Sequence, residues 1–343
     1  MSSGKRKILL VGGGTLGSVS PLLAISANYP AEYLFIGTID GPEKDFVLSQ
    51  GIANFQAIKS GKLRRYFDVK NFSDIFQTVA GFFQSLKIIW NFKPDIVLTA
   101  GSFVAVPVVF AAWLLRKPVI VHQQDIAVGL ANKLMAPFAK KITVLFPEQV
   151  KDFDSRKTVI TGNPVRSVKI DLEKNEPLVL ITGGGLGART MNEFVKQFVP
   201  KILAAGFKVY HLLGAKNADQ SLSLDGYYSD KFINKNMMDI LARADIVISR
   251  AGMSSISEAA ALKKALVLIP MTGTHQERNA AFLAKKNAAL MIRQYNYKIM
   301  DRYLDKLLNK EDLRKALGDN LNNLFPQNAV NDYVILINQI LNE

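Results

Sequence analysis

Two glycine-rich stretches, Gly12-Gly13-Gly14-Thr15-Leu16-Gly17 and Gly183-Gly184-Gly185-Leu186-Gly187-Ala188, lie almost half a chain apart in this sequence of 343 residues. Each follows a short apolar run, Ile8-Leu9-Leu10-Val11 in the first half and Leu178-Val179-Leu180-Ile181 in the second. Such runs are typical of buried parallel strands. A strand that ends in glycines before a helix directs free backbone N–H groups and a helix N-terminus toward one point, which suits an anion. The repeated pattern predicts two Rossmann-like domains.

The rest of the chain alternates strand-like and helical segments, which is typical of βαβ units and parallel sheets. We expect strands at 7–11, 33–37, 54–58, 95–99, 118–122 and 142–145 in the first half, and at 178–182, 207–213, 245–249, 265–269 and 288–292 in the second. A connector from Thr161 to Pro177 separates the halves. Apolar residues at helical spacing predict a closing helix over residues 329–341.

The net charge of +14 is the one unusual bulk property, because the composition of 49% hydrophobic and 21% charged residues is ordinary for a globular protein. The charge implies attraction to an anionic partner such as nucleic acid, phospholipid or a phosphorylated substrate. No recognition motif for nucleic acid accompanies it, so we expect no nucleic-acid partner. The chain has no cysteine, which excludes disulfides and thiolate metal sites.

The longest apolar run, Phe103–Leu115, has 13 residues and contains Pro107. A helix that crosses a bilayer needs about 20 residues, so we expect a soluble protein.

An amphipathic helix is predicted between Asn71 and Phe92, where apolar residues recur at intervals of three and four. Its ordinary interpretation is a helix packed on a sheet. The stripe is aromatic, however, and the window 59–93 carries seven basic residues against two acids, a combination typical of surfaces that rest among lipid headgroups. The side chains expected to face a membrane are Phe76, Val79, Phe82, Phe83, Leu86, Trp90 and, after the Phe103 run, Trp113.

The pattern Gly12-x-Gly14-x-x-Gly17 matches the dinucleotide fingerprint as a string. That fingerprint also needs an acid at the end of the second strand to hold the ribose. The corresponding strand ends Phe35-Ile36-Gly37-Thr38, which disfavours a nicotinamide enzyme. The alternative is that these glycines only permit a tight turn.

The stretch from Asp245 to Glu258 carries more information, because a strand ends in small residues and Glu258 follows within the next helix. Small residues let a ligand approach the helix N-terminus, and a carboxylate one turn inside accepts both hydroxyls of a ribose. The alternative is that Ser254 and Ser255 cap the helix while Glu258 stays solvated. Downstream, the stretch His275–Ala280 offers amide groups suited to sugar hydroxyls.

Taken in order, these segments resemble the MurG family, the transferases that add N-acetylglucosamine to lipid I during peptidoglycan synthesis. The resemblance spans nearly the whole chain. It rests on Gly13-Gly14-Thr15 with Val19 and Pro21, Gly37-Thr38 with Glu43, Lys93-Pro94-Asp95, His122-Gln123-Gln124, Gly129-Leu130 with Asn132-Lys133, Gly162-Asn163-Pro164-Val165-Arg166, Gly187-Ala188-Arg189 with Asn192, Ala244-Asp245 through Ser249-Arg250-Ala251-Gly252 to Glu258, and Gln276 with Asn279-Ala280.

The resemblance implies a GT-B fold, in which two Rossmann-like domains with parallel sheets face a cleft. The donor occupies the C-terminal domain, the lipid acceptor occupies the N-terminal domain, and neither a metal nor another cofactor is required. We expect an acceptor domain at 1–162, a donor domain at 163–326 and a C-terminal helix at 327–343 that returns toward the first domain.

The same resemblance assigns roles to individual residues. In the donor domain, Phe232 and Ile233 would hold the uracil and Glu258 the ribose. The diphosphate would lie against the turn with Gly184, Gly185 and Gly187, the helix start at Ser254, and Arg166 from the connector, while Gln276 and Asn279 would read the sugar. The loop for the acceptor and its diphosphate would consist of Gly13, Gly14, Thr15, Gly17, Ser18, Gln123 and Asn132.

The acceptor half departs from the family at three positions. Ser18 replaces the usual histidine of the glycine loop, Gln123 and Asp125 replace the glutamate and asparagine of His-Glu-Gln-Asn, and Phe103 replaces a tyrosine. Inverting transfer needs a base for the proton of the attacking hydroxyl, and serine, glutamine and phenylalanine cannot act as one at neutral pH. His122 and Asp125 are the remaining catalytic candidates.

The expected function is that of a hexosyltransferase at the cytoplasmic face of the plasma membrane, held there peripherally by an anionic lipid surface. It would move N-acetylglucosamine from UDP-N-acetylglucosamine to lipid I. Two alternatives remain: transfer to a different lipid, such as a diacylglycerol, and a catalytically silent protein that only binds the UDP-sugar.

Overall fold

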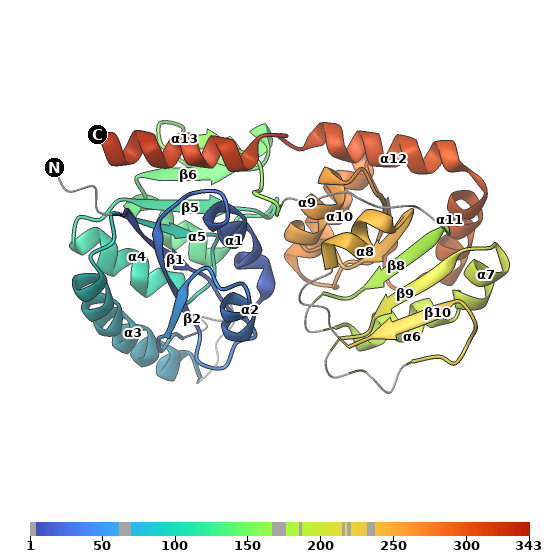
Figure 1. Cartoon of the computed structure of the whole chain (residues 1–343), viewed down its shortest axis with the longest axis horizontal. Coiled ribbons are helices and arrows are strands. Elements are labelled where there is room, and N and C mark those ends of the chain that lie inside the picture. The colour runs from blue at the N-terminus through green and yellow to red at the C-terminus, as the bar shows by residue number, and fades with distance from the viewer. Residues whose placement is uncertain are drawn as a thin grey trace. The chain divides into compact units, whose positions relative to one another are not determined.

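The computed structural model describes residues 5–61, 70–166, 176–184, 187–214, 217, 221–231 and 237–343, with the backbone alone at 70–73. The chain divides into two compact units (Figure 1). Unit 1 comprises Met1–Gln124, Val128–Arg166 and Pro326–Glu343, and unit 2 comprises Asp125–Ala127 and Ser167–Phe325. Within the described residues, every helix is too short or too polar to cross a membrane.

Unit 1 contains a parallel sheet of seven strands in the order β3-β2-β1-β4-β5-β6-β7. The strands are β1 (Lys7–Val11), β2 (Glu32–Gly37), β3 (Asn54–Ala57), β4 (Ile96–Thr99), β5 (Val119–Gln123), β6 (Lys141–Val144) and β7 (Thr158–Ile160). Both neighbours of β1 run parallel to it, with Leu10 opposite Phe35 of β2 and Leu98 of β4. The direction in which the chain adds strands therefore reverses between β1 and β4.

Helices cover both faces of this sheet. They are α1 (Ser20–Ser26), α2 (Glu43–Ser49), α3 (Lys70–Phe92), α4 (Ala105–Leu114), α5 (Leu130–Met135) and α13 (Ala329–Asn342), with short 3-10 turns at η1 (Leu16–Ser18), η2 (Ala136–Phe138) and η3 (Pro147–Asp152). Alternate residues of one strand enter different cores, because successive side chains of a strand point to opposite faces. Leu9 packs in the core with α3, α4 and α5, whereas Leu10 packs in the core with α1, α2 and α13.

The last helix, α13, is part of the core of unit 1. Its Tyr333, Leu336, Ile337 and Ile340 are buried beside β1 and β2. The hydroxyl of Tyr333 also forms a hydrogen bond with the hydroxyl of Thr143 on β6. Helix α13 thus covers one face of the sheet whose first strand begins at Lys7.

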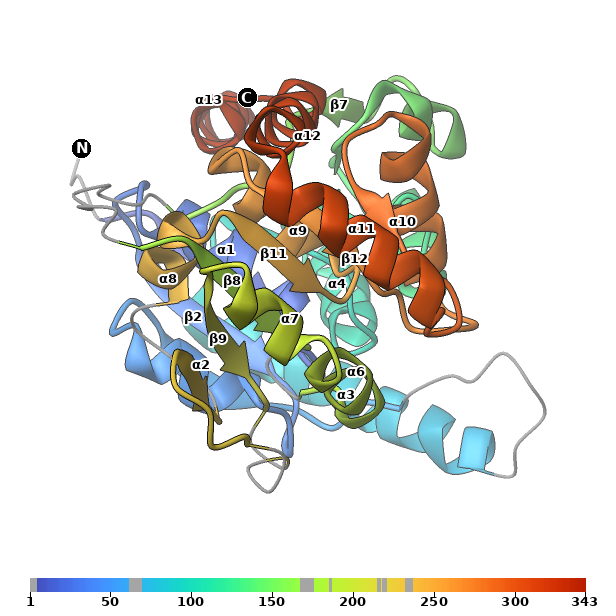
Figure 2. The same ribbon diagram turned by 90° about the vertical axis from the view of Figure 1, so that its right-hand side faces the viewer.

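Unit 2 contains a parallel sheet of six strands in the order β10-β9-β8-β11-β12-β13. These are β8 (Leu178–Thr182), β9 (Lys208–Leu212), β10 (Tyr227–Asp230), β11 (Ile246–Ser249), β12 (Ala265–Leu268) and β13 (Leu290–Met291). The helices are α6 (Arg189–Lys196), α7 (Val199–Ala204), α8 (Met237–Arg243), α9 (Met253–Ala261), α10 (His275–Lys285), α11 (Tyr297–Asn309) and α12 (Glu311–Leu324). One core joins the sheet to α6, α7, α11 and α12, and Figure 2 shows α7 in front of β8 and β9.

The predicted α/β architecture with two parallel sheets is confirmed. All eleven predicted strands occur within two residues of the expected bounds, and the predicted helices at 71–92 and 329–341 are α3 and α13. Strands β7 and β10 were not predicted. Each lies at the edge of its sheet and pairs with a single neighbour.

Candidate functional site

The strand order of unit 2 reverses between β8 and β11, which are direct neighbours. In open parallel sheets, ligands bind outside the carboxyl ends of the strands at this reversal, because the loops there diverge to opposite faces. The loop after β8 is the second glycine stretch, and the loop after β11 is Arg250–Gly252. The topology therefore places the two predicted donor motifs of unit 2 side by side.

The second glycine stretch requires glycine for conformation and for space. Gly184 and Gly187 have positive φ angles of 84° and 75°. The Gly184 N–H donates to Oγ1 of Thr182 at 3.2 Å, and the Gly187 N–H donates to the Gly184 carbonyl at 2.9 Å. A Cβ atom on Gly187 would lie 2.4 Å from the Leu213 carbonyl oxygen. Gly185, predicted to face the diphosphate, lies outside the described residues, as do the predicted uracil residues Phe232 and Ile233.

Helix α9 begins at Met253 after an N-cap at Gly252 that makes no side-chain capping bond. The alternative in which Ser254 and Ser255 cap this helix is therefore wrong, since both lie inside its first turn and are half-buried. Glu258 is only 8% exposed, so the alternative of a solvated carboxylate is wrong as well. The structure thus places a buried carboxylate in the second turn of the helix that begins at the strand reversal of unit 2.

Arg250 ties the loop after β11 to the loop after β12. Its guanidinium donates to the carbonyls of Ile269 at 3.0 Å and Pro270 at 3.3 Å, and to the hydroxyl of Tyr295 at 2.8 Å. These contacts are a reason for the arginine that is independent of any ligand, because they fix two loops at the same edge of the sheet.

Asn279 on α10 is fully buried and holds the segment 125–127. Its Nδ2 donates to Oδ1 of Asp125 at 2.8 Å and to the Ala251 carbonyl at 3.0 Å, and its Oδ1 accepts the Ile126 N–H at 3.0 Å. Gln276, one turn earlier, accepts the Met271 N–H at 3.1 Å. Both residues were expected to read the donor sugar, and both use their amide groups on the protein here. The bond from Asn279 to Asp125 had no signal in the sequence.

The strand order of unit 1 reverses between β1 and β4, and the first glycine stretch follows β1. Its N–H groups are used within the protein. The Gly13 N–H donates to Oγ of Ser18 at 3.1 Å, and the Gly14 N–H donates to Oε2 of Glu43 at 3.2 Å. Glu43 is fully buried, and its other oxygen accepts the N–H and the hydroxyl of Thr38 at 2.6 and 2.5 Å. A carboxylate of the protein thus occupies the turn where a nucleotide phosphate would bind in a dinucleotide domain.

Ser18, which stands where the family has histidine, is buried at 8% exposure. Its hydroxyl lies within hydrogen-bond distance of the Thr15 carbonyl at 3.3 Å besides accepting the Gly13 N–H. The serine therefore closes the glycine turn. Gly17 accepts a further bond from Nε2 of Gln124 at 3.1 Å, and Thr15 is exposed.

Asn132 on α5 carries a buried oxygen that has no hydrogen-bond partner among the residues that the structure describes. Its Nδ2 donates to the His122 carbonyl at 3.0 Å and to Oε1 of Gln123 at 2.7 Å. A Cβ atom on Gly101, in the loop after β4, would lie 3.1 Å from the unpartnered Oδ1. An unpaired buried acceptor costs about 1–3 kcal/mol, which a hydroxyl or amide of a ligand can relieve.

His122 lies in a buried polar network of unit 1. Its Nδ1 is 2.9 Å from Oγ1 of Thr143, and its Nε2 is 2.9 Å from Oδ1 of Asn163. Burial lowers the pKa of His122 to about 4. With both ring nitrogens engaged and 1% of the residue exposed, this environment favours a structural role over the catalytic one predicted for it. Asp125, whose side chain is 32% exposed, is the more accessible of the two predicted residues.

Arg166, predicted to aid the diphosphate, belongs to unit 1 and lies over the ring of Phe46 on α2, with 5.6 Å between the guanidinium carbon and the ring centre.

The apolar residues of α3 that were predicted to face a membrane fall into two groups that differ in exposure. Phe76, Phe83 and Trp90 are 64–69% exposed. Val79 on the same helix and Trp113 on α4 are about half exposed. Phe82 and Leu86 instead pack against the core that α4 shares with the sheet. These two residues are half-buried, so the apolar positions of α3 contact the core as well as the surface, and their contact with a membrane stays a prediction.

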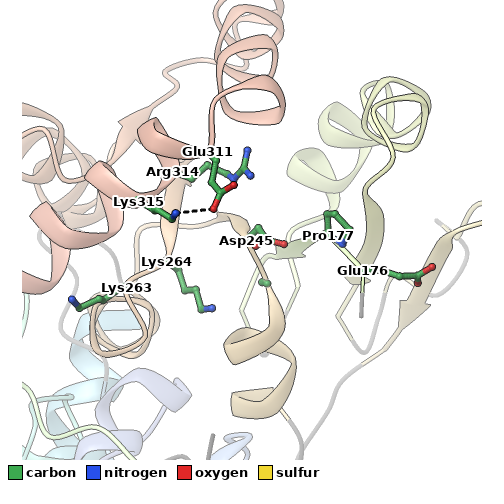
Figure 3. Close-up of a pocket in the computed structure, with 9 residues that line it drawn as sticks. Glu176, Pro177, Asp245, Lys263, Lys264, Glu311, Arg314 and Lys315 are labelled. Carbon is green, nitrogen blue, oxygen red and sulfur yellow. Dashed lines mark ion pairs between the residues drawn. The ribbon is translucent and has the colours of Figure 1, made fainter. Parts of the chain in front are cut away.

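A pocket of about 360 Å³ lies at the opposite edge of the unit 2 sheet, where β8 and β11 begin (Figure 3). Its cations already have partners in the protein. Lys315 pairs with Glu311 at 2.9 Å, Lys264 donates to the Ala242 carbonyl at 2.5 Å, and Arg314 donates to the Leu307 carbonyl at 2.6 Å. The last two bonds satisfy carbonyls in the final turns of α8 and α11, where cations are favourable. These three cations therefore serve contacts within the protein.

Two family models match the chain. The model of the glycosyltransferase family 28 N-terminal domain matches residues 8–144, and that of the family 28 C-terminal domain matches residues 178–331. A UDP-N-acetylglucosamine–N-acetylmuramyl-(pentapeptide) pyrophosphoryl-undecaprenol N-acetylglucosamine transferase of Clostridium botulinum (strain Loch Maree / Type A3) is 41% identical over 323 residues, covering 89% of this chain and 90% of the relative. The equally named protein of Clostridium perfringens (strain ATCC 13124) is 36% identical over 348 residues, covering 93% and 97%.

Among solved structures, the crystal structure of MurG from Acinetobacter baumannii superposes with a TM-score of 0.74 at 25% identity, covering 97% of this chain and 99% of that one. The predicted type of fold, two Rossmann-like domains of the GT-B class, is thereby confirmed. The chain belongs to glycosyltransferase family 28 and, within it, to the MurG family of UDP-N-acetylglucosamine transferases.

Proposed function

We propose that this chain is an inverting transferase that moves N-acetylglucosamine from UDP-N-acetylglucosamine to lipid I, a MurNAc-pentapeptide carried on a polyprenyl diphosphate, and so forms lipid II. The relatives named for this reaction are 36–41% identical over about nine-tenths of the chain. The single observation within the structure that carries the proposal is the buried carboxylate of Glu258 beside the start of α9 at the strand reversal of unit 2.

The donor site consists of the loops after β8 and β11. The ribose hydroxyls bind Glu258, and the diphosphate lies against Gly184, Gly187 and the first turn of α9 at Ser254. Charge develops on UDP as its bond to the sugar breaks, and oriented backbone N–H groups stabilise that charge without reorganisation. The uracil residues Phe232 and Ile233 and the diphosphate residues Gly185 and Arg166 remain part of the proposal by resemblance.

The acceptor site lies at the strand reversal of unit 1. Glu43 fills the nucleotide position of the first glycine turn, which supports a ligand other than a nucleotide there. The unpartnered Oδ1 of Asn132 offers an acceptor to a hydroxyl or amide of the MurNAc-peptide. Gln123 contacts Asn132 directly and so positions it.

Membrane contact is made by the outer face of α3 and the end of α4. The apolar side chains exposed there include Phe76, Val79, Phe83, Trp90 and Trp113. Lys87, Lys93 and Arg116 are exposed on or beside the same helices. Each cation near an anionic leaflet contributes about 1 kcal/mol. The anionic lipids of the cytoplasmic leaflet therefore favour a peripheral position on that side, and no nucleic acid is needed to explain the charge.

The test is a transfer assay with radiolabelled UDP-N-acetylglucosamine and lipid I in vesicles, comparing wild type with Glu258→Gln. The wild type should form labelled lipid II. The variant should raise the KM for the donor by about tenfold or more, since a charged hydrogen bond contributes about 1.5–3 kcal/mol. Lys285→Gln, an exposed change on α10, is the matched control. A wild type that binds UDP but labels no lipid I would instead favour the silent binder suggested by Ser18 and Gln123, and labelling of diacylglycerol would favour the other acceptor.

A further inference from the structure

Glycosyl transfer constrains where its base must lie. The attacking hydroxyl loses its proton while its oxygen bonds to the anomeric carbon, so the base has to reach an atom in contact with the donor sugar. This inference rests on the proposed function and adds the group that removes the proton. The base is therefore expected within reach of the donor sugar, which the proposed function places beside Gln276 and Asn279 at the beginning of α10.

The chain has three histidines, and all lie in the described part. His122 and His211 are buried, each ring has both nitrogens hydrogen-bonded, and burial lowers the pKa of each to about 4. Their protons are not accessible to a substrate. His275 is the first residue of α10, and 51% of its side chain is exposed.

His275 faces a carboxylate that the protein holds in place. Its Nε2 lies 3.7 Å from Oδ2 of Asp125. The other oxygen of Asp125 accepts from Nδ2 of Asn279 at 2.8 Å, and the next backbone N–H, of Ile126, donates to Oδ1 of the same Asn279. Since Asn279 is fully buried and also bonds Ala251, the carboxylate is fixed relative to α10.

The other charged groups near His275 are directed elsewhere. Glu277 on the same helix accepts the Gly273 N–H at 3.1 Å, and Arg278 is exposed. Arg250, from the loop after β11, donates to two carbonyls and to Tyr295. Among the described residues, Asp125 is thus the charged group that the structure places against the imidazole.

We propose that His275 is the general base of this chain and that Asp125 positions it. Because Asp125 lies on the Nε2 side of the ring, at 3.7 Å, its charge favours the tautomer with the proton on Nε2, which leaves Nδ1 as the proton acceptor. The acceptor oxygen bonds to the anomeric carbon from the face opposite UDP, its proton passes to Nδ1, and the carbon–oxygen bond to UDP breaks with its electron pair leaving on UDP. The resulting imidazolium faces the carboxylate. A histidine on α10 thereby replaces the histidine that the glycine loop lacks at Ser18.

The experiment compares wild type, His275→Ala, Asp125→Asn and the double variant in two assays. One measures N-acetylglucosamine transfer to lipid I, and the other measures UDP release when water is the acceptor, which needs the same base. His275→Ala should lower kcat about 10²–10⁴-fold, as loss of a general base does, with the KM for the donor unchanged. Added imidazole should restore its rate in proportion to concentration, and a series of substituted imidazoles should restore it in the order of their basicity.

The double variant distinguishes positioning from direct catalysis. Asp125→Asn should lower kcat in the wild-type background, and have no further effect once His275 is absent, because the carboxylate acts through the imidazole. Lys285→Gln on the same helix is the control that should keep wild-type kcat. The affinity of each variant for UDP, measured by calorimetry, reports that unit 2 is intact.

Two results would contradict the roles proposed for His275 and Asp125. One is a His275→Ala variant with wild-type kcat in both assays, and the other is an Asp125→Asn effect that persists undiminished without His275. A wild type that releases UDP in water but labels no lipid I would contradict only the proposed acceptor. The hydrolysis assay would still show whether His275 is the base.

Discussion

In unit 1, the side chain of Glu43 occupies the glycine turn where a nucleotide phosphate would otherwise bind. Glu43 accepts three hydrogen bonds, from the N–H groups of Gly14 and Thr38 and from the hydroxyl of Thr38. In Glu43→Gln, an amide NH₂ replaces one oxygen and meets a donor. We expect the free energy of unfolding to fall by about 1–3 kcal/mol, measured by urea denaturation. Lys44→Gln, the exposed neighbour, should change it by less than about 0.5 kcal/mol. Equal effects of the two would contradict the role of Glu43.

The two buried histidines predict a pH dependence of stability. Burial lowers the pKa of His122 and of His211 from 6.5 to about 4 in the folded protein. The unfolded chain therefore binds protons first as the pH falls, and stability present above pH 6.5 is lost between pH 6.5 and 4. The loss approaches about 3 kcal/mol for each histidine, at about 1.4 kcal/mol per pKa unit. Unfolding free energies across this range should fall less steeply in His122→Gln/His211→Gln than in wild type or Lys285→Gln, and parallel slopes would argue against neutral buried histidines.

For the proposed donor site, the types of residue were easier to predict from the sequence than the contacts that they make. Glu258 and the start of α9 followed from small residues after a strand, which is local information. That Asn279 would hold Asp125 could not be predicted, because the two residues lie 154 positions apart in the sequence. The strands on either side of β5 bury His122. From the sequence alone, a polar residue within an apolar run can be either a functional residue or a core residue whose hydrogen bonds are made within the protein.

At the scale of elements, the sequence predicted every central strand and the edge strands β3 and β13, but it missed the edge strands β7 and β10. β1 and β8 are continuous apolar runs because both of their faces are buried. β10, Tyr227-Tyr228-Ser229-Asp230, has one buried residue, and β7 has three residues, none of them buried. β10 takes its strand character from pairing with β9. The β-branched residues Thr158-Val159-Ile160 of β7 do favour a strand, but a run of three residues is too short to be identified as one from the sequence.

The sequence of α3 likewise did not show which of its apolar residues face the core and which face outward, since aromatic residues occupy both faces of the helix. We expect Phe83→Ser/Trp90→Ser to weaken binding to vesicles with anionic lipid by at least tenfold, because two large exposed apolar side chains no longer enter the headgroup region. Sedimentation with vesicles measures this. Ile335→Ser, an exposed apolar residue of α13, is the control in the same unit, and similar losses for both variants would place the membrane contact elsewhere.

At the scale of the whole molecule, the chain repeats one topology twice and uses the two strand reversals differently. Unit 1 fills its glycine turn with Glu43, whereas the turn of unit 2 adjoins a helix start and the buried Glu258. The final helix, α13, returns to the core of unit 1, so residues from both ends of the sequence fold together and most of unit 2 lies between them in sequence.

This arrangement predicts that the two units respond to different perturbations. Ile337 is fully buried in unit 1, and Ile337→Ala should lower the free energy of unfolding by about 2–5 kcal/mol, seen in calorimetry as a lower transition temperature for unit 1. UDP stabilises only the unit that binds it, so it should raise the transition of unit 2 and leave that of unit 1 unchanged, in wild type and variant alike. Ile335→Ala, two residues away and exposed, should leave both transitions in place. If UDP instead raised the transition that Ile337→Ala lowers, the nucleotide would bind unit 1, and the assignment of the donor to Glu258 and the start of α9 would be wrong.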